Sequence, residues 1–172
     1  MANTTFSGPV RSLNGFISFG PKAVVSLEAT ATLTVAAHAG RVLTCNAASG
    51  KFTLPSITSG SSAAAAGTND YNVASNLGCT YLFWVQTLAV DMDILTDGTD
   101  KFVGAVYTGI DSEETGETFL AAAANDVMTF NGTTTGGIVG SWVEFTAIGS
   151  AAYFVRGSLI GTATLATPFA DA

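Results

Sequence analysis

Short segments in which apolar or aromatic residues alternate with polar ones constrain the fold of this chain more than any other feature. Residues 32–35 and 51–54 alternate in this way, and Pro55 ends the second segment. A period of two residues is that of a β-strand, whose successive side chains point to opposite faces of a sheet. Further strands are expected at residues 81–85, 90–94, 102–107, 127–130, 142–148 and 153–156. The pattern predicts an all-β fold, a single β-sandwich or barrel-like domain.

Turn and loop signals separate these segments. Asp97-Gly98 and Asn131-Gly132 tolerate the positive φ angles of tight turns, so we expect a hairpin at each. Residues 59–76 are small and polar, and their four consecutive alanines are too few for a stable isolated helix. We expect a long surface loop there. Residues 109–118 contain four acidic residues and are expected to form a second, solvated loop.

The chain has 172 residues, and domains commonly contain about 50 to 250. We therefore expect one domain with an arm. Residues 1–21 are too polar to form a core of their own, and we interpret them as an extended N-terminal arm. Residues 22–172 are predicted to form the β-rich domain, with a C-terminal tail from about residue 162. Apolar side chains in the two end segments have little local core to bury them and are the candidate interface residues: Phe6, Val10, Leu13, Phe16, Phe19 and Phe169.

The other aromatic residues recur at strand positions, where they can fill the core of a sandwich. They are Tyr81, Phe83, Trp84, Phe102, Phe130, Trp142, Phe145, Tyr153 and Phe154. In a further strand, Val90, Met92 and Ile94 are expected to share one face. Asp91 and Asp93 are expected to share the other.

The charge balance argues against two classes of partner. Six Lys and Arg residues are scattered among thirteen Asp and Glu, and the formal net charge is −7. Binding to phosphates requires clustered cationic side chains, so we expect no nucleic-acid partner, and the same deficit argues against an anionic membrane surface. Mean hydropathy is +0.42, yet no window offers the roughly 18 apolar residues of a membrane span.

The composition also indicates that other protein covers much of the surface of the folded chain. Only 11% of the residues are charged, which is unusual for the surface of a free monomer. The opening MANTTFSGPVRSLNG lacks a basic start followed by an apolar segment, so we expect no signal peptide and synthesis in the cytoplasm. Cys45 and Cys79 are accordingly expected to be reduced strand residues.

Few residues could support catalysis or bind a metal ion. His38 is the only histidine, and we interpret it as a surface turn residue. Glu144 alternates with apolar neighbours, so it is expected to point to solvent or an interface, whereas glycosidases need a pair of carboxylates. Asp91, Asp93 and residues 97–100 could offer oxygen ligands to Ca²⁺, but strand alternation followed by a turn explains them equally. We therefore favour a non-enzymatic protein without a cofactor, and a bound cation remains the lesser alternative.

Several segments carry a resemblance to a known class of proteins. In the first half of the chain they are the opening MANTTFSGPVRSLNGF and a strand at residues 41–43 that leads into the Gly-x-x-Thr-Leu-Pro step at residues 50–55. In the second half they are a hairpin around Asn131-Gly132, the Gly-x-Trp strand at 140–145 and the aromatic-Val-x-Gly strand at 153–157. Together they resemble the capsid decoration, or head-stabilising, proteins of tailed bacteriophages, especially marine phages. The segment 59–76 has no counterpart in that pattern.

The resemblance implies a structural protein that forms homo-oligomers, with a trimer expected, and binds the outside of a phage capsid. There it would clamp neighbouring major capsid subunits against the pressure of the packaged DNA. Its expected location is the virion, and its expected partners are itself and the major capsid protein. The alternative is a tail-fibre or head-fibre module that binds a host surface glycan. A polysaccharide hydrolase is a weaker third possibility.

Overall fold

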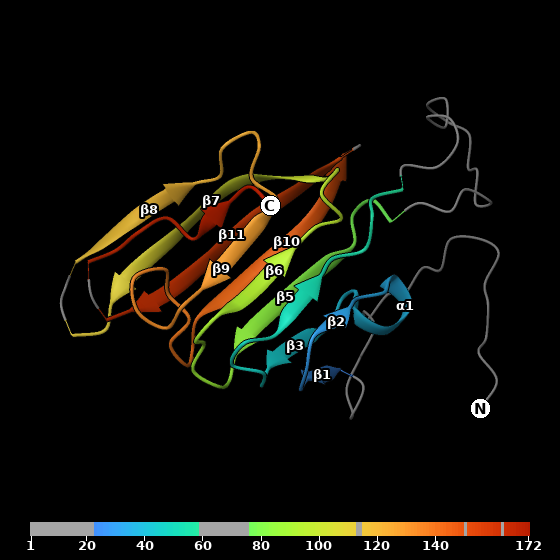
Figure 1. Ribbon diagram of the computed structural model, residues 1–172. Coiled ribbons are helices and arrows are strands. Elements are labelled where there is room, and N and C mark those ends of the chain that lie inside the picture. Colours follow the sequence, from blue (N-terminus) through green and yellow to red (C-terminus); the bar gives the residue numbers. More distant parts are fainter. Residues whose placement is uncertain (1–22, 59–75, 113–114, 150, 163) are drawn as a thin grey trace, which may run out of the picture.

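The computed structural model describes residues 23–58, 76–112, 115–149, 151–162 and 164–172. In chain order the strands are β1 (Val24–Leu27), β2 (Ala31–Thr32), β3 (Val42–Cys45), β4 (Lys51–Thr53), β5 (Thr80–Val85), β6 (Met92–Leu95), β7 (Lys101–Ile110), β8 (Gly116–Leu120), β9 (Val127–Phe130), β10 (Trp142–Gly149), β11 (Ala152–Gly161) and β12 (Phe169–Ala170). A single-turn helix, α1 (Val35–His38), lies between β2 and β3 (Figure 1). No helix in these ranges has the length and hydropathy to cross a membrane. The predicted arm and nearly all of the predicted loop at 59–76 lie outside the described residues.

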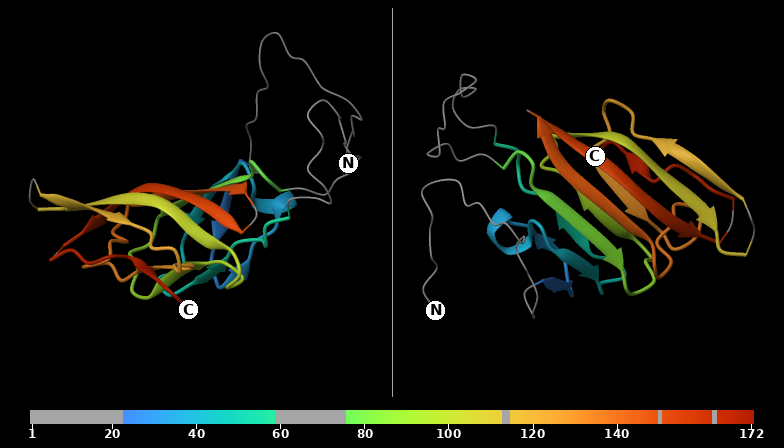
Figure 2. Two further views of the ribbon diagram at one scale, coloured as in Figure 1. Left: turned by 90° about the horizontal axis from the view of Figure 1, so that it is seen from above. Right: turned by 180° about the vertical axis from the view of Figure 1, so that it is seen from behind.

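Two mixed sheets pack face to face and confirm the predicted all-β sandwich (Figures 1 and 2). The seven-stranded sheet has the order β1-β3-β5-β10-β11-β7-β8, and the five-stranded sheet has the order β12-β9-β6-β4-β2. In the first sheet β1, β3 and β5 are parallel, and β10 is antiparallel to both of its neighbours. In the second sheet β2, β4 and β6 are parallel.

The parallel pairs follow from the path of the chain, which passes from one sheet to the other at every connection from β1 to β7. Asp97-Gly98 and Asn131-Gly132 lie in connections of this kind. Both form turns, with φ of 87° at Gly98 and 73° at Gly132. The predicted hairpins are nevertheless wrong, because the strands that flank each turn belong to different sheets.

The core lies between the sheets and consists of the inward side chains of both. The ring of Phe83 lies 5.8 Å from that of Phe145 on the neighbouring strand and 6.2 Å from that of Phe52 in the opposite sheet. Phe102 lies 5.0 Å from Phe145. Each of these four residues is at most 1% exposed. Aromatic contacts across and along the sheets therefore hold the two layers together.

Residues 32–35 do not form the predicted strand. β2 ends at Thr32, and Thr34 caps α1, where its Oγ1 accepts a hydrogen bond from Ala37 N–H at 3.3 Å. The N–H of Thr34 donates to Nδ1 of His38 at 2.9 Å. A threonine at this position satisfies backbone groups that the start of a helix leaves unpaired, and this local bonding prevails over the alternation. His38 is the last, partly exposed residue of this single turn, which fits its interpretation as a surface turn residue.

The C-terminal segment, which was expected to be a tail from about residue 162, ends in a strand of the five-stranded sheet. β12 pairs antiparallel with β9, and Phe169 is 6% exposed, with its ring 6.4 Å from that of Phe102. Asp126 fixes the chain end by accepting hydrogen bonds from Ala172 N–H at 3.0 Å and Lys101 Nζ at 2.6 Å. The prediction of Phe169 as an interface residue is therefore wrong, because β12 turns this side chain into the core.

Two smaller predictions also need correction. Much of the acidic segment 109–118 is strand, since β7 runs to Ile110 and β8 begins at Gly116, and the two form a hairpin. Val90 does not share the buried face of Met92 and Ile94. It lies before the start of β6 and is 63% exposed.

Candidate functional site

The face of the seven-stranded sheet that is turned away from the core, termed the outer face, carries exposed aromatic side chains. β5 shows how the sequence places them. Tyr81, Phe83 and Val85 point into the core, so Leu82 and Trp84 point outward. All five are apolar, and Trp84 remains 50% exposed. A strand that is apolar on both faces is typical of a sheet covered on both sides, and the five-stranded sheet covers only one.

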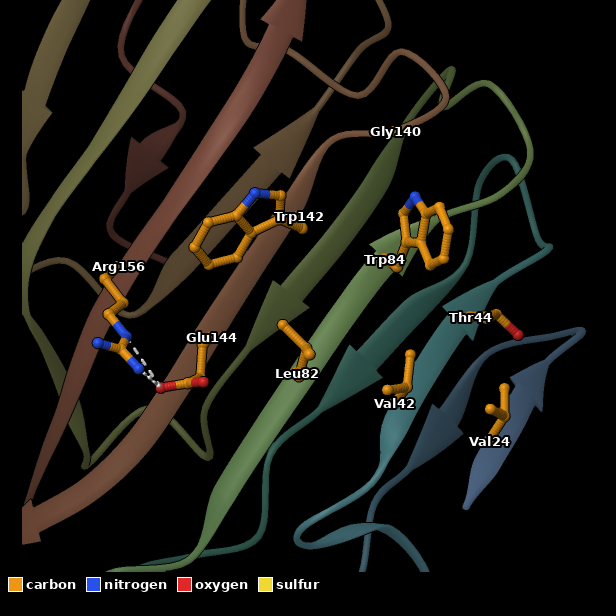
Figure 3. Close-up of a pocket in the computed structure, with 9 residues that line it drawn as sticks. All are labelled: Val24, Val42, Thr44, Leu82, Trp84, Gly140, Trp142, Glu144 and Arg156. Atoms are coloured by element: carbon orange, nitrogen blue, oxygen red, sulfur yellow. Dashed lines mark hydrogen bonds and ion pairs between the residues drawn. The ribbon is translucent and has the colours of Figure 1, made fainter. Parts of the chain in front are cut away.

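Neighbouring strands bring further side chains beside Trp84. Trp142 lies opposite Trp84 in the antiparallel pair of β5 and β10, and Glu144 lies opposite Leu82. On the other side, Val42 of β3 lies opposite Leu82. Side chains that face each other across a strand pair have Cβ atoms about 5 Å apart. They therefore form one continuous patch (Figure 3).

A groove of about 620 Å³ crosses this patch over β1, β3, β5, β10 and β11. Its lining residues are Val24, Val42, Thr44, Leu82, Trp84, Gly140, Trp142, Glu144 and Arg156. Most of them are apolar, and Figure 3 shows the two indoles projecting from adjacent strands. A smaller hollow of about 320 Å³ shares Thr44 and Trp84 with the groove and adds Gln86 and Val139.

One end of the groove is polar because Glu144 and Arg156 pair across β10 and β11. Nε of Arg156 donates a hydrogen bond to Oε1 of Glu144 at 3.0 Å, and Nη2 forms an ion pair with the same oxygen at 2.8 Å, as drawn in Figure 3. The side chains are 60% exposed for Arg156 and 20% for Glu144, so the pair adds little to stability. It does neutralise both charges and keeps hydrogen-bonding groups beside the indoles. The prediction that Glu144 points out of the core is confirmed.

The outer face stays apolar beyond the groove, over β11, β7 and β8. We call this region the flank and define it by four exposed side chains: Val103, Tyr107, Leu120 and Phe154. Phe154 lies opposite Val103 in the parallel pair of β11 and β7, and β8 adds Leu120, which is 73% exposed. Contiguous exposed apolar side chains are typical of surfaces that bind another molecule.

The outer face of the five-stranded sheet is polar by comparison. Asp93 on β6 accepts a hydrogen bond from Thr129 Oγ1 at 2.7 Å and forms an ion pair with Lys51 Nζ at 3.0 Å. The three residues lie side by side on β4, β6 and β9, so their polar groups are satisfied within the chain. The molecule therefore has one broad polar face and one broad aromatic face.

Two of the candidate cation ligands, Asp97 and Asp100, accept hydrogen bonds from loop residues of the chain. Asp97 accepts hydrogen bonds from Ser56 Oγ at 2.7 Å and from the N–H groups of Thr99 and Asp100, and these bonds lower the pKa of Asp97. Asp100 accepts a hydrogen bond from Ile57 N–H at 2.8 Å, and burial raises the pKa of its carboxyl group. Within the described part of the chain, no three His, Cys, Asp or Glu side chains gather as metal ligands.

The two cysteines are free thiols, as predicted. Cys45 is a buried strand residue, and burial raises its pKa to about 12, so the thiol stays protonated at neutral pH. Cys79 is partly exposed and lies just before β5, not within it.

The predicted core was correct in part. Six of the aromatic residues expected there are buried: Tyr81, Phe83, Phe102, Phe130, Phe145 and Tyr153. Trp84, Trp142 and Phe154 lie on the outer face instead. The signal that could have located the outer face is the run 81–85, which lacks a polar residue in either phase of its alternation. Five candidate interface residues lie outside the described residues: Phe6, Val10, Leu13, Phe16 and Phe19.

The mostly apolar lining of the groove is suited to binding. Its lining contains one carboxylate, that of Glu144, which Arg156 engages, whereas a glycosidase needs two. Aromatic anchors within an apolar patch are typical of the buried centre of protein interfaces. No family model, curated protein or solved structure matches the chain. The functional interpretation therefore rests on the outer face, with its groove and flank.

Proposed function

We propose that the chain is a structural, non-enzymatic virion protein that binds the outside of a phage capsid as a homo-oligomer, expected to be a trimer. In this role it links neighbouring major capsid subunits and stabilises their lattice. The observation that carries the proposal is the aromatic outer face, which extends over seven strands with no covering layer in the described part of the chain. That the partner is a phage capsid is inferred from the resemblance of the sequence to capsid decoration proteins.

Covering the outer face supplies the binding energy. A half-exposed tryptophan leaves roughly 100 Å² of its surface in water, and covering that area is worth about 2.5 kcal/mol at about 25 cal/mol per Å². Several side chains of the outer face are exposed to a similar degree. Their sum has to exceed the cost of lost translation and rotation, and symmetric copies on a lattice share that cost.

The two faces of the sandwich suit an attached particle protein. The polar face, with the Asp93, Lys51 and Thr129 cluster, can remain in water without cost. The aromatic face would turn toward the shell and toward sister subunits. This orientation leaves no large apolar area exposed on the decorated particle.

The flank provides the test for capsid binding. We expect the double variant Tyr107→Ser/Leu120→Ser to bind undecorated capsids at least tenfold more weakly than the parent protein, measured by co-sedimentation. The two side chains are 49% and 73% exposed, so their loss should leave the fold intact, which a thermal melt checks. Val90→Ser is the matched control, because Val90 is 63% exposed and lies outside the seven-stranded sheet.

Equal sedimentation of the parent, the flank variant and the control would contradict docking through the outer face. Failure of the parent protein itself to bind capsids would contradict the proposed particle.

A second function, binding of a host surface glycan by a fibre module, is favoured by one observation. Trp84 and Trp142 present exposed indoles next to the polar groups of Glu144 and Arg156, a combination that can stack on sugar rings and bond their hydroxyls. Titration with purified host polysaccharide should then shift tryptophan fluorescence in the parent protein, and Trp84→Ser should abolish the shift. An unchanged parent spectrum at saturating polysaccharide would exclude this alternative.

A further inference from the structure

We propose that the groove binds the N-terminal segment of a second copy of the chain, residues 10–19, so that copies are joined arm to groove. The inference rests on the self-assembly in the proposed function and names the contact that produces it. It also divides the outer face, with the groove serving sister subunits and the flank serving the capsid.

The point of attachment of the arm supports this contact. Residues 1–22 precede β1, which is an edge strand of the seven-stranded sheet, and Val24 at the start of β1 lines the groove. The backbone carbonyl of Ala23 accepts a hydrogen bond from Val42 N–H at 3.1 Å, which holds the root of the arm beside β3. The arm therefore begins at the margin of the groove.

The direction of the backbone favours an exchange between copies. β1, β3 and β5 run parallel, and Val24, Val42 and Leu82 lie side by side in one outward row. Trp84 lies in the next outward row along the strand direction. β1 thus runs from its start at Val24 toward the row that holds Trp84, and an arm that continued the line of β1 backward from Val24 would have to reverse to reach the indoles of its own copy. The arm of a neighbour approaches without that reversal.

The chemistry of the arm matches that of the groove. Apolar residues at 10, 13, 16, 17 and 19 provide two phenylalanine rings, which can pack against the indoles of Trp84 and Trp142. The arm, residues 1–21, contains Arg11 and no acidic residue, whereas the rest of the chain has five cationic and all thirteen acidic residues. The arm is therefore +1 and the remainder −8, and this complementarity draws an arm toward another copy.

The reach of the arm is sufficient. An extended chain covers about 3.5 Å per residue, so residues 10–22 span roughly 45 Å. A domain of about 150 residues has a radius of gyration of about 15 Å. An arm-to-groove contact uses two different surfaces, and repetition of such a contact generates a ring when the rotation closes. A closed trimer is one such ring.

Two defective variants test the exchange. Phe16→Ser/Phe19→Ser removes the rings of the arm, and Trp84→Ser/Trp142→Ser removes the indoles of the groove. We expect the parent to be a stable oligomer in size-exclusion chromatography with light scattering and each variant alone to be a 17.4 kDa monomer. The described core lies wholly within residues 27–169, and both indoles are at least 40% exposed, so both variants should fold, which circular dichroism checks. Leu120→Ser, in the flank, is the control and should keep the oligomer.

Mixing the two variants separates exchange from other contacts. The Trp84→Ser/Trp142→Ser protein (the groove variant) keeps its arm, and the Phe16→Ser/Phe19→Ser protein (the arm variant) keeps its groove, so the arm of the first can enter the groove of the second. The opposite contact cannot form, because it would join a defective arm to a defective groove. The mixture should therefore contain a 1:1 heterodimer of twice the monomer mass and no larger species.

Three results would overturn the proposal. They are a monomeric parent, an arm variant that keeps the parent mass, and a mixture that stays monomeric. A groove covered by the arm of its own copy gives the first result. Capsid co-sedimentation of the flank variant is independent of these masses, so failure of the arm exchange and failure of the proposed function are distinguishable.

Discussion

Phe83 and Trp84 are adjacent on β5, and they offer a direct test of the difference between the core and the outer face. Phe83 is 1% exposed and its ring contacts those of Phe52 and Phe145. Truncation of a buried phenylalanine to alanine removes the burial and leaves a cavity, at a cost of about 3 to 5 kcal/mol. The two ring contacts place Phe83→Ala near the middle of that range, at about 4 kcal/mol.

Trp84→Ala should cost far less although tryptophan is the larger residue. About half of its side chain is in water, so roughly 100 Å² of buried area is at stake, or about 2.5 kcal/mol. The unfolded chain already shelters part of that area, which reduces the loss to about 1.5 to 2 kcal/mol. Solvent fills the vacated space, so no cavity cost is added.

Urea denaturation followed by circular dichroism measures both losses in free energy of unfolding. The slope against urea should be unchanged in both variants, since neither alters the surface exposed on unfolding by much. A dilution series separates folding from association, because only association makes stability depend on protein concentration. Equal losses for the two variants at the lowest concentration would refute the assignment of Trp84 to the outer face.

Three further predictions concern the fold. Gly104 has φ of +131°, and an added Cβ would lie 2.2 Å from Val155 O. Gly104→Ala should therefore lower the melting temperature by about 10 °C, which corresponds to about 3 kcal/mol in a domain of this size. Gly149→Ala, whose Cβ meets nothing within 4 Å, should change the melting temperature little. Asp97 has a depressed pKa in the fold, so its hydrogen bonds stabilise the protein above the ordinary carboxyl pKa of about 3.9 and are lost as pH falls. Asp97→Asn should therefore melt lower than the parent at pH 7 and approach it near pH 3, and a gap that is constant with pH would contradict this. Thiol titration should label Cys79 alone in the native protein and both cysteines in urea, because Cys45 is buried and its pKa is raised to about 12.

The strands were predictable where the pattern is local. Residues 127–130 coincide with β9, and residues 142–148 differ from β10 by one residue at the end. Alternation of side chains is a property of the strand itself, so it is visible without knowledge of the partner strand. The capped turn at Thr34 escaped this reasoning because a hydroxyl that bonds to the backbone competes with the strand geometry.

The pairing of strands was not predictable, because nothing local states which sheet a strand joins. Asp97-Gly98 has the same turn chemistry whether a hairpin partner or a strand of the opposite sheet follows. For the same reason the candidate site was missed. Alternation separates Phe83 from Trp84, but both phases of β5 are apolar, so the sequence alone does not tell which phase faces the second sheet.

The groove joins segments that are far apart in the chain, and this has a consequence for biosynthesis. Its lining begins at Val24 and ends at Arg156. Its parallel strands cannot pair as hairpins, and long-range pairing of this kind is slow. A nascent or truncated chain that lacks β10 and β11 has no groove to offer. Under the arm-exchange proposal, a ribosome-bound chain can present an arm long before it can accept one, so copies become able to assemble only when synthesis is nearly complete.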